Sequence, residues 1–529
     1  MKQIFFAGQL FSIAMLLSLE SACSGAYDKS SRHYWDTAEQ ANPADIADDD
    51  NGEEPGAEKE DDFLALKPAQ TDVYVFVANP DRDTVTRVNV LTHAVDTTDV
   101  GHDPSMVLTT PDYQKAVVFN RGDDSVTIVN ANTLETQEVE VRDNFNNMVM
   151  SPDDAGEWVV LWHDIDAEAE DDPAVPGLLS YNEASFVNIL TGAHFPMAVG
   201  FNPRAIEFTP DASVAVVVSD DYLTFVDLSA ATPTPRLIEV AEDPVNPPAA
   251  EEVILAPDGT YAFVRQFGGT DLVVVDLLTY EVDRIPVGDT PTDLDLSPDG
   301  SMAALVARAD EELWLFEVAD PHRPAQVLDL PAAEGLGSLL FDPTGKQGIL
   351  YTTATATDHY ATWDVDSGKI TVRSLVKPVS TMAMSPTGES LLAFHTQTNA
   401  VDANSTSPFH NSWALTMIDL GDFRTNPLKL PAAPTGYAHS TNGNFAFFIM
   451  EQQPFLEVLH FDKLIYDQVT LKSNPVFVGV LPDLNTNDDD EPPVWISQEH
   501  ELGRITFYDA DDGSLETITG FELNSHIED

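Results

Sequence analysis

A short apolar-turn-apolar phrase recurs along the chain and constrains its fold more than any other feature. It reads "DLDLSPDGSMAALVA" at 293–307, "IEFTPDASVAVVV" at 206–218, "VILAPDGTYAFV" at 253–264 and "MAMSPTGESLLAF" at 382–394. With two degenerate copies included, its turns fall at Pro68, Pro111, Pro152, Pro210, Pro257, Pro298, Pro343, Pro386, Thr441 and Pro482. Successive turns are 43, 41, 58, 47, 41, 45, 43, 55 and 41 residues apart. A period in the forties predicts one four-stranded antiparallel sheet per repeat.

The repeat at 287–330 shows how one such unit is composed. Its expected strands are 293–296, 302–307, 312–319 and 325–330. The second strand is apolar at almost every position, because neighbouring units cover both faces of the middle strands. Gly300 supplies the positive φ that a tight turn often needs. No long helical periodicity separates the repeats, so we predict an all-β chain that forms a β-propeller of about ten four-stranded antiparallel blades.

Two sequence phrases resemble the YVTN family of β-propellers. Residues 74–79 read "YVFVAN" and are followed by "DTVTRVNVLTHAVDTTDVGHDP", and a Val-Gly-x-x-Pro link recurs at 100–104, 199–203 and 287–291. The resemblance covers about 63–525. It implies the propeller fold and leaves function open, since propellers include sensors, scaffolds and enzymes. No linker interrupts the repeats, which favours a single ring of nine or ten blades. Seven or eight blades would be usual for the family, and two smaller rings are an alternative.

The N-terminus resembles a bacterial lipoprotein signal. Lys2 precedes a mostly apolar stretch at 4–19, which is too short for a comfortable membrane span, and Cys23 follows two small residues. Glu20 stands where the lipoprotein pattern has an apolar residue. The resemblance implies that residues 1–23 are a signal, that Cys23 carries lipid, and that Ser24 directs the protein to the outer membrane. A secreted protein and an uncleaved anchor are the alternatives.

The balance of charges limits the partners of this chain. It carries 89 acidic and 25 basic residues, a net charge of −64. Such a chain repels nucleic acids and anionic lipid surfaces, so we expect membrane contact only through a lipid anchor. The acidity reflects solubility or a salt-rich habitat; the alternative is cation binding. Residues 24–62 are acidic and poor in aliphatics, which predicts a disordered tether spanning about 30–40 Å before a propeller at 63–527. The single cysteine excludes an intramolecular disulfide.

Insertions indicate where the chain makes contacts. The two longest spacings come from insertions between the second and third strands, at 163–184 and 395–414, and a shorter one at 241–250 precedes a first strand. In a propeller these loops emerge on the same face, which we interpret as a binding face; neutral loop drift is the alternative. Polar residues at the ends of the second strands should lie on the same face and hold a ligand or partner, or form a hydrated rim: Asn79, Asn120, His163, Arg308, His395, Glu451 and Gln498.

One acidic loop is a candidate calcium site. In "DLNTNDDDEPP" at 483–493 the spacing of Asp483, Asn485, Asn487 and Glu491 matches that of calcium loops, where alternate residues converge oxygens on one cation. Asp488 stands where that pattern has glycine. Ca²⁺ is therefore the one candidate cofactor, and a solvated acidic loop is the alternative.

No catalytic motif is present, whether a nucleophile elbow, a phosphate-binding loop, a dinucleotide fingerprint or a paired-histidine zinc motif. We therefore expect a monomeric, non-enzymatic propeller in the bacterial cell envelope, tethered or secreted. Its loop-rich face would bind a protein, a glycan or a small ligand. The alternative is a propeller enzyme, lactonase-like or cofactor-binding, that uses the central channel.

Overall fold

The computed structural model describes residues 68–165, 181–220, 222–240, 250–266, 269–332, 335–400, 404–482 and 493–523. In these ranges the chain forms 40 β-strands and two short 3-10 helices, η1 (Pro80–Arg82) and η2 (Phe521–Leu523), and no α-helix. The strands make ten four-stranded sheets, and in each sheet the strands pair in chain order. The chain is therefore an all-β protein with the β-propeller fold, and the predicted count of ten blades is confirmed.

The described residues fall into two compact units. The terminal unit lies within 68–217, 224–237 and 434–523, and the middle unit within 218–223 and 238–433. The terminal unit holds blades 1, 2, 3, 9 and 10, the middle unit holds blades 5, 6, 7 and 8, and the residues of blade 4 are divided between them.

The blades of the terminal unit have the following strands. Blade 1 comprises β1 (Ala69–Gln70), β2 (Tyr74–Asn79), β3 (Thr84–Asn89) and β4 (Val95–Asp99). Blade 2 comprises β5 (Pro104–Thr109), β6 (Lys115–Asn120), β7 (Ser125–Asn130) and β8 (Thr136–Glu140). Blade 3 comprises β9 (Asn147–Met150), β10 (Trp158–Trp162), β11 (Glu183–Asn188) and β12 (Ala193–Ala198). Blade 9 comprises β33 (Pro434–His439), β34 (Phe445–Met450), β35 (Phe455–His460) and β36 (Ile465–Thr470). Blade 10 comprises β37 (Pro475–Val480), β38 (Val494–Gln498), β39 (Arg504–Tyr508) and β40 (Leu515–Thr519).

The remaining blades follow the same order. Blade 4 comprises β13 (Pro203–Phe208), β14 (Val214–Ser219), β15 (Tyr222–Asp227) and β16 (Pro235–Glu239). Blade 5 comprises β17 (Ala250–Leu255), β18 (Tyr261–Gln266), β19 (Asp271–Asp276) and β20 (Val282–Pro286). Blade 6 comprises β21 (Pro291–Leu296), β22 (Met302–Ala307), β23 (Glu312–Glu317) and β24 (Gln326–Asp329). Blade 7 comprises β25 (Ser338–Phe341), β26 (Gln347–Tyr351), β27 (His359–Asp364) and β28 (Lys369–Ser374). Blade 8 comprises β29 (Thr381–Met384), β30 (Ser390–His395), β31 (Ala414–Asp419) and β32 (Thr425–Lys429).

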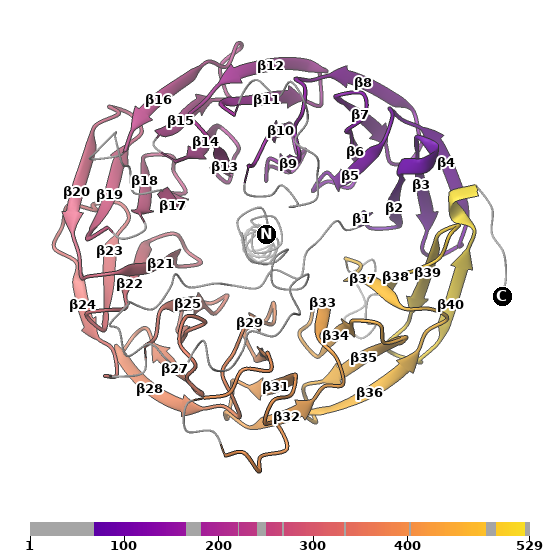
Figure 1. The fold of residues 1–529 in the computed structure, drawn as a ribbon. Helices are drawn as coiled ribbons and strands as arrows, with labels where there is room; N and C mark the ends of the chain where they lie inside the picture. Colours follow the sequence, from indigo (N-terminus) through magenta and orange to yellow (C-terminus); the bar gives the residue numbers. More distant parts are fainter. Residues whose placement is uncertain are drawn as a thin grey trace, which may run out of the picture. The chain divides into compact units, whose positions relative to one another are not determined.

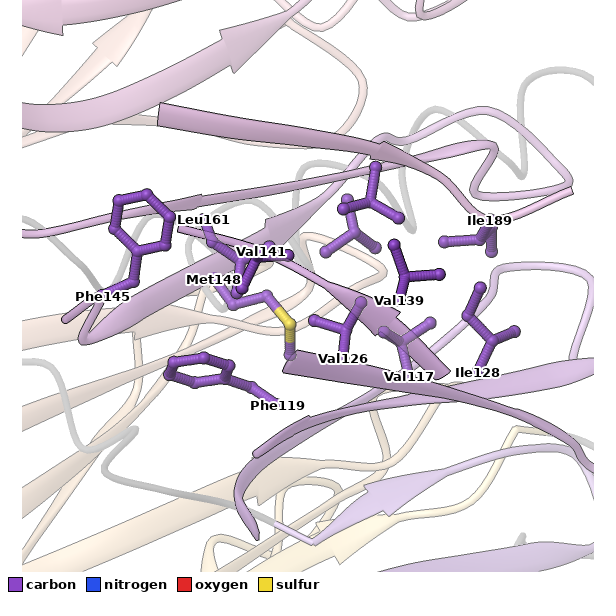
Figure 2. Packing of buried hydrophobic residues seen from close by; sticks show 12 residues of the cluster. Val117, Phe119, Val126, Ile128, Val139, Val141, Phe145, Met148, Leu161 and Ile189 are labelled. Carbon is purple, nitrogen blue, oxygen red and sulfur yellow. The ribbon is translucent and has the colours of Figure 1, made fainter. Parts of the chain in front are cut away.

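Cores form between successive blades, as the unbroken apolar second strands predict. In β22, residues 303–307 are all buried. The core between blades 2 and 3 gathers Phe119 of β6, Ile128 of β7 and Leu161 of β10 (Figure 2). Each blade thus buries both faces of its middle strands, and burial of apolar area supplies most of the free energy that favours folding.

In the terminal unit, the first blade of the chain packs against the last. Figure 1 shows blade 1, in indigo, beside blade 10, in yellow, and their shared core includes Val75, Val88, Trp495 and Phe521. Gln70 of the two-residue strand β1 donates from Nε2 to the Val480 carbonyl at 2.7 Å and accepts from the Trp495 indole. Contacts between residues more than 400 positions apart therefore join the two ends of the repeat array.

The recurring Pro-x-x and Pro-x-Gly corners turn the chain and also pack against the corner of the preceding blade. In blade 6, Gly300 has φ of +67°, as the sequence predicts, and a Cβ there would overlap Cγ of Pro257, the corner proline of blade 5. In blade 8, a Cβ on Gly388 would lie 2.8 Å from Cδ of Pro343, the corner proline of blade 7. Real Cβ atoms essentially never approach that closely, so the corner glycine allows both the positive φ and the close packing of successive blades.

Candidate functional site

Four of the seven predicted site residues cross-link their own blade. Asn120, at the end of β6, is fully buried, and its Nδ2 donates to Ser125 Oγ at 3.0 Å and to Thr127 Oγ1 at 2.9 Å on β7. Asn79 makes the equivalent bonds from β2 to two threonines of β3, both at 2.9 Å. The amides satisfy buried hydroxyls and hold the second strand to the third.

Gln498, at the end of β38, extends this arrangement to the linker that enters the blade. Its Nε2 donates to the Thr506 hydroxyl on β39. Its Oε1 accepts the backbone N–H groups of Lys472 and Ser473, each at 3.1 Å. The side chain is 4% exposed, so its polar atoms serve the blade and its linker.

His395, at the end of β30, likewise contacts both the third strand of blade 8 and the linker that enters the blade. It is 1% exposed; Nδ1 lies 2.9 Å from the Pro378 carbonyl and Nε2 lies 2.8 Å from Thr416 Oγ1. A carbonyl only accepts, so the proton is on Nδ1 and Nε2 accepts from the Thr416 hydroxyl. Burial, above all, lowers the pKa of His395 to about 4. The imidazole is therefore neutral at pH 7.

The other three predicted residues lie one position beyond their second strands. His163 is buried, and its Nδ1 lies 2.7 Å from the Asn144 carbonyl. Arg308 is 7% exposed, whereas Glu451 lies exposed in the turn after β34. Asn79, Asn120, His163, Glu451 and Gln498 belong to the terminal unit, and Arg308 and His395 to the middle unit.

A threonine recurs at one position of the third strand in four blades, and the predictions from the sequence do not include its role. Thr86, Thr127, Thr416 and Thr506 are all buried and occupy the same position in their blades, two residues past the one paired with the end of the second strand. Each follows an aliphatic residue, so an apolar-Thr pair in the third strands of blades 1, 2, 8 and 10 was the available signal. In blade 9, Glu457 takes this position; Gln468 donates to it at 2.7 Å, and burial raises its pKa.

Aromatic side chains lie at the described ends of the blade 3 insertion. The rings of His163 and Tyr181, at the two ends of the described part of this loop, lie 5.4 Å apart. Tyr181 in turn lies 6.3 Å from Phe201, in the linker between β12 and β13, and its carbonyl accepts the Asn202 N–H at 2.8 Å. Phe201 is 53% exposed. We call His163, Tyr181 and Phe201 the blade 3 platform.

The blade 8 insertion is also held by a linker. Lys377, in the linker between β28 and β29, donates from Nζ to the carbonyl of Ser412, near the end of the insertion. Lys377 is only 3% exposed, and burial, with a smaller effect of Lys429, lowers its pKa to about 8. In both blades, therefore, the long loop contacts an interblade linker, as expected for loops on one face of a blade.

Several predicted features lie outside the described residues. These are Cys23, the tether at 24–62, and the calcium candidates Asp483, Asn485, Asn487 and Glu491. Among the residues that the structure describes, no three His, Cys, Asp or Glu side chains gather in a way that could hold a metal ion. The described ranges also contain no helix with the length and apolar character needed to cross a bilayer.

Neither a family model nor a curated protein matches this sequence. Solved structures do match. A eukaryotic initiation factor aligns with a TM-score of 0.50 and 12% identity over 76% of this chain and 97% of its own. The dihydro-heme d1 dehydrogenase NirN, in complex with DHE, aligns at 0.43 and 15% identity over 69% and 74%, and apo AztD from Citrobacter koseri at 0.36 and 13% identity over 62% and 90%. At these identities the likeness concerns the fold alone.

Proposed function

We propose that this chain is a non-enzymatic binding propeller of the YVTN type, anchored to the bacterial envelope, whose blade 3 platform contacts a protein or glycan partner. The observation that carries the proposal is the exposed ring of Phe201, held against Tyr181 where the blade 3 insertion meets the next linker. Aromatic side chains fixed in this way supply contact area at a low cost in conformational entropy, and they are enriched among residues that dominate binding.

The support beneath the platform favours a preformed site. Asn146 Nδ2 donates to the Asp164 carbonyl at 2.8 Å, and the Asp164 N–H donates to Asn146 Oδ1 at the same distance. This reciprocal pair fixes the start of the insertion, next to His163. A side chain held in place before binding loses less conformational entropy when a partner binds.

The test is capture of a partner from detergent-solubilised envelope by the immobilised full-length protein. Phe201→Ser should weaken retention of the captured species at least about tenfold, as expected for the loss of a central aromatic contact. Leu91→Ser is the matched control: Leu91 is 64% exposed, belongs to the same unit, and lies in the turn between β3 and β4. Equal retention by the wild type and Phe201→Ser would exclude the platform as the contact. Loss of capture after protease or after periodate treatment of the extract identifies a protein or a glycan partner.

The envelope location is tested at Cys23. Cys23→Ala should move the protein from the membrane fraction to the soluble fraction, because the lipidated cysteine would be the attachment to the bilayer. Metabolic labelling with a palmitate analogue should mark the wild type and leave the variant unmarked. Unchanged partitioning of the variant would indicate an uncleaved anchor, and a soluble, unlabelled wild type would indicate secretion.

A further inference from the structure

One segment of the middle unit departs from the acidity of the chain. Residues 367–388 contain Lys369, Arg373 and Lys377 and no aspartate or glutamate, although acids outnumber bases by 89 to 25 overall. The segment forms β28, the linker that follows it, and β29. The local charge is therefore positive within a strongly negative protein.

Lys377 is the buried member of this segment. Its Nζ contacts the Ser412 carbonyl, and within the described ranges no carboxylate lies at ion-pair distance from it. An ammonium group has three N–H donors, and one carbonyl satisfies only one of them. Burying such a cation without a counter-charge destabilises the folded state, so a structural role alone would be met better by an apolar side chain.

A second lysine lies on the same side of blade 8. His395 pairs with Ala414, and Ala414 pairs with Lys429, so these three side chains point to one face of the sheet. Ala414, between the two larger side chains, is fully buried. Lys429 is exposed, pairs with no carboxylate among the described residues, and is close enough to Lys377 to lower its pKa.

Asp358 of blade 7 also lies beside this linker: its carbonyl accepts the Leu375 N–H at 2.7 Å, and its Oδ1 lies 3.1 Å from His359 Nδ1. The side chains of Arg373, Tyr360 and His395 are positive or neutral. On β28 of blade 7, the guanidinium of Arg373 lies over the Phe423 ring at 3.2 Å and donates to Thr362. The pKa of Tyr360 is raised to about 12, chiefly by burial, so its hydroxyl stays neutral, and His395 is neutral as well. In the insertion, the buried Nδ1 of His410 has no hydrogen-bond partner in the part of the chain that the structure describes.

We propose that Lys377 and Lys429 bind a small oxyanion, such as a phosphate or carboxylate group, where the blade 7–8 linker meets the blade 8 insertion. The anion supplies the acceptors and the counter-charge that the described residues do not give these two lysines. It enters from the side of Lys429, whose ammonium is exposed. Charge-assisted hydrogen bonds to a buried ammonium are about twice as strong as neutral ones, which favours binding despite the overall negative charge.

The test is thermal unfolding of the full-length protein with inorganic phosphate or acetate near pH 7, with chloride used to keep the ionic strength constant. The wild type should show a saturable rise in Tm with at least one anion. Lys377→Met should weaken the apparent affinity at least about tenfold, and Lys429→Gln, at an exposed position, by about two- to fivefold. Lys463→Gln, an exposed lysine in the turn between β35 and β36, is the control and should respond like the wild type.

Folding and binding are separable in this experiment. Lys377→Met removes an uncompensated buried charge, so its Tm without added anion should equal or exceed that of the wild type. Raising the pH to about 9.5 neutralises Lys377 and should reduce the wild-type response towards that of Lys377→Met. A response of equal size in all four proteins, or the lack of any saturable response to either anion, would overturn the proposal. Both outcomes are independent of partner binding at the blade 3 platform.

Discussion

Between pH 6.5 and about pH 4 the wild-type protein should lose about 3 kcal/mol of folding free energy that a His395→Gln variant keeps. The pKa of this buried imidazole falls from 6.5 to about 4 on folding, so in this range the unfolded chain binds a proton that the folded chain does not. The stabilising contribution is therefore complete above pH 6.5 and is lost as the pH falls through the folded-state pKa. The loss should appear in urea unfolding followed by tryptophan fluorescence at both pH values.

The structure explains why glutamine is a suitable replacement. An amide can donate to the Pro378 carbonyl and accept from Thr416, and Gln498 already occupies the equivalent position in blade 10. Protonation of His395 would instead place a second proton on Nε2 and bury a charge.

His194→Gln serves as the comparison for His395→Gln. Its imidazole also has a lowered pKa, from burial and then from Arg142, but it is only partly buried, so its substitution should change the acid sensitivity less. If His395→Gln lost as much stability as the wild type over the same range, His395 would not be the group responsible.

Trp495→Ala should lower the free energy of unfolding by about 3–5 kcal/mol, the usual cost of removing a fully buried tryptophan. Trp495 is 2% exposed and lies in the core shared by blades 1 and 10. It covers Gly479 on the adjacent strand, where a Cβ would overlap the indole. The substitution also leaves Gln70 without its indole donor, so the attachment of β1 to blade 10 should weaken. Urea unfolding measures the first effect.

Limited proteolysis distinguishes a loss at this junction from a general loss of stability. Trp495→Ala should increase cleavage within blades 1 and 10. Trp363→Ala is the matched control, because Trp363 covers Gly348 in the same way within blade 7 and is fully buried. Cleavage of both variants at the same sites would contradict a special role of Trp495 in joining the first and last blades. Trp495→Phe, which keeps an aromatic ring but no N–H donor, should fall between the wild type and Trp495→Ala.

Much of the fold could be predicted because the same strand-turn-strand pattern occurs in every repeat. The pattern predicts the second strand of blade 6 at 302–307, and β22 is Met302–Ala307. The first strand begins two residues earlier than the pattern predicts, at Pro291. Pro291 starts the strand through an irregular register, pairing with Ala307 before the ladder resumes at Asp293. A local sequence pattern does not predict where this strand begins, because its first residue is defined by pairing with the neighbouring strand. The degenerate repeat around Thr441 also forms a complete blade, blade 9.

The candidate site was less accessible to sequence reasoning. Of the seven polar residues, four end their second strands and three lie one position beyond, and their partners depend on which side chains share a face. Asn120 and Gln498 contact threonines across the next hairpin, at separations of 7 and 8 residues. Lys377 meets Ser412, 35 residues away, only because the linker and the insertion fold together. The calcium candidates and Cys23 remain predictions for experiment.

The sequence by itself determined the all-β class, the ten blades, the corners and the positions of the insertions, because each depends on short-range patterns repeated along the chain. Tertiary structure alone decided which polar groups are satisfied and which are not. Burial and pairing are set by contacts between distant segments: His395 is neutral because Pro378, Thr416 and the surrounding core enclose it. Lys377 lies buried near Lys429, with no counter-charge among the described residues. The sequence does not predict this environment, because no local pattern specifies what packs around a side chain.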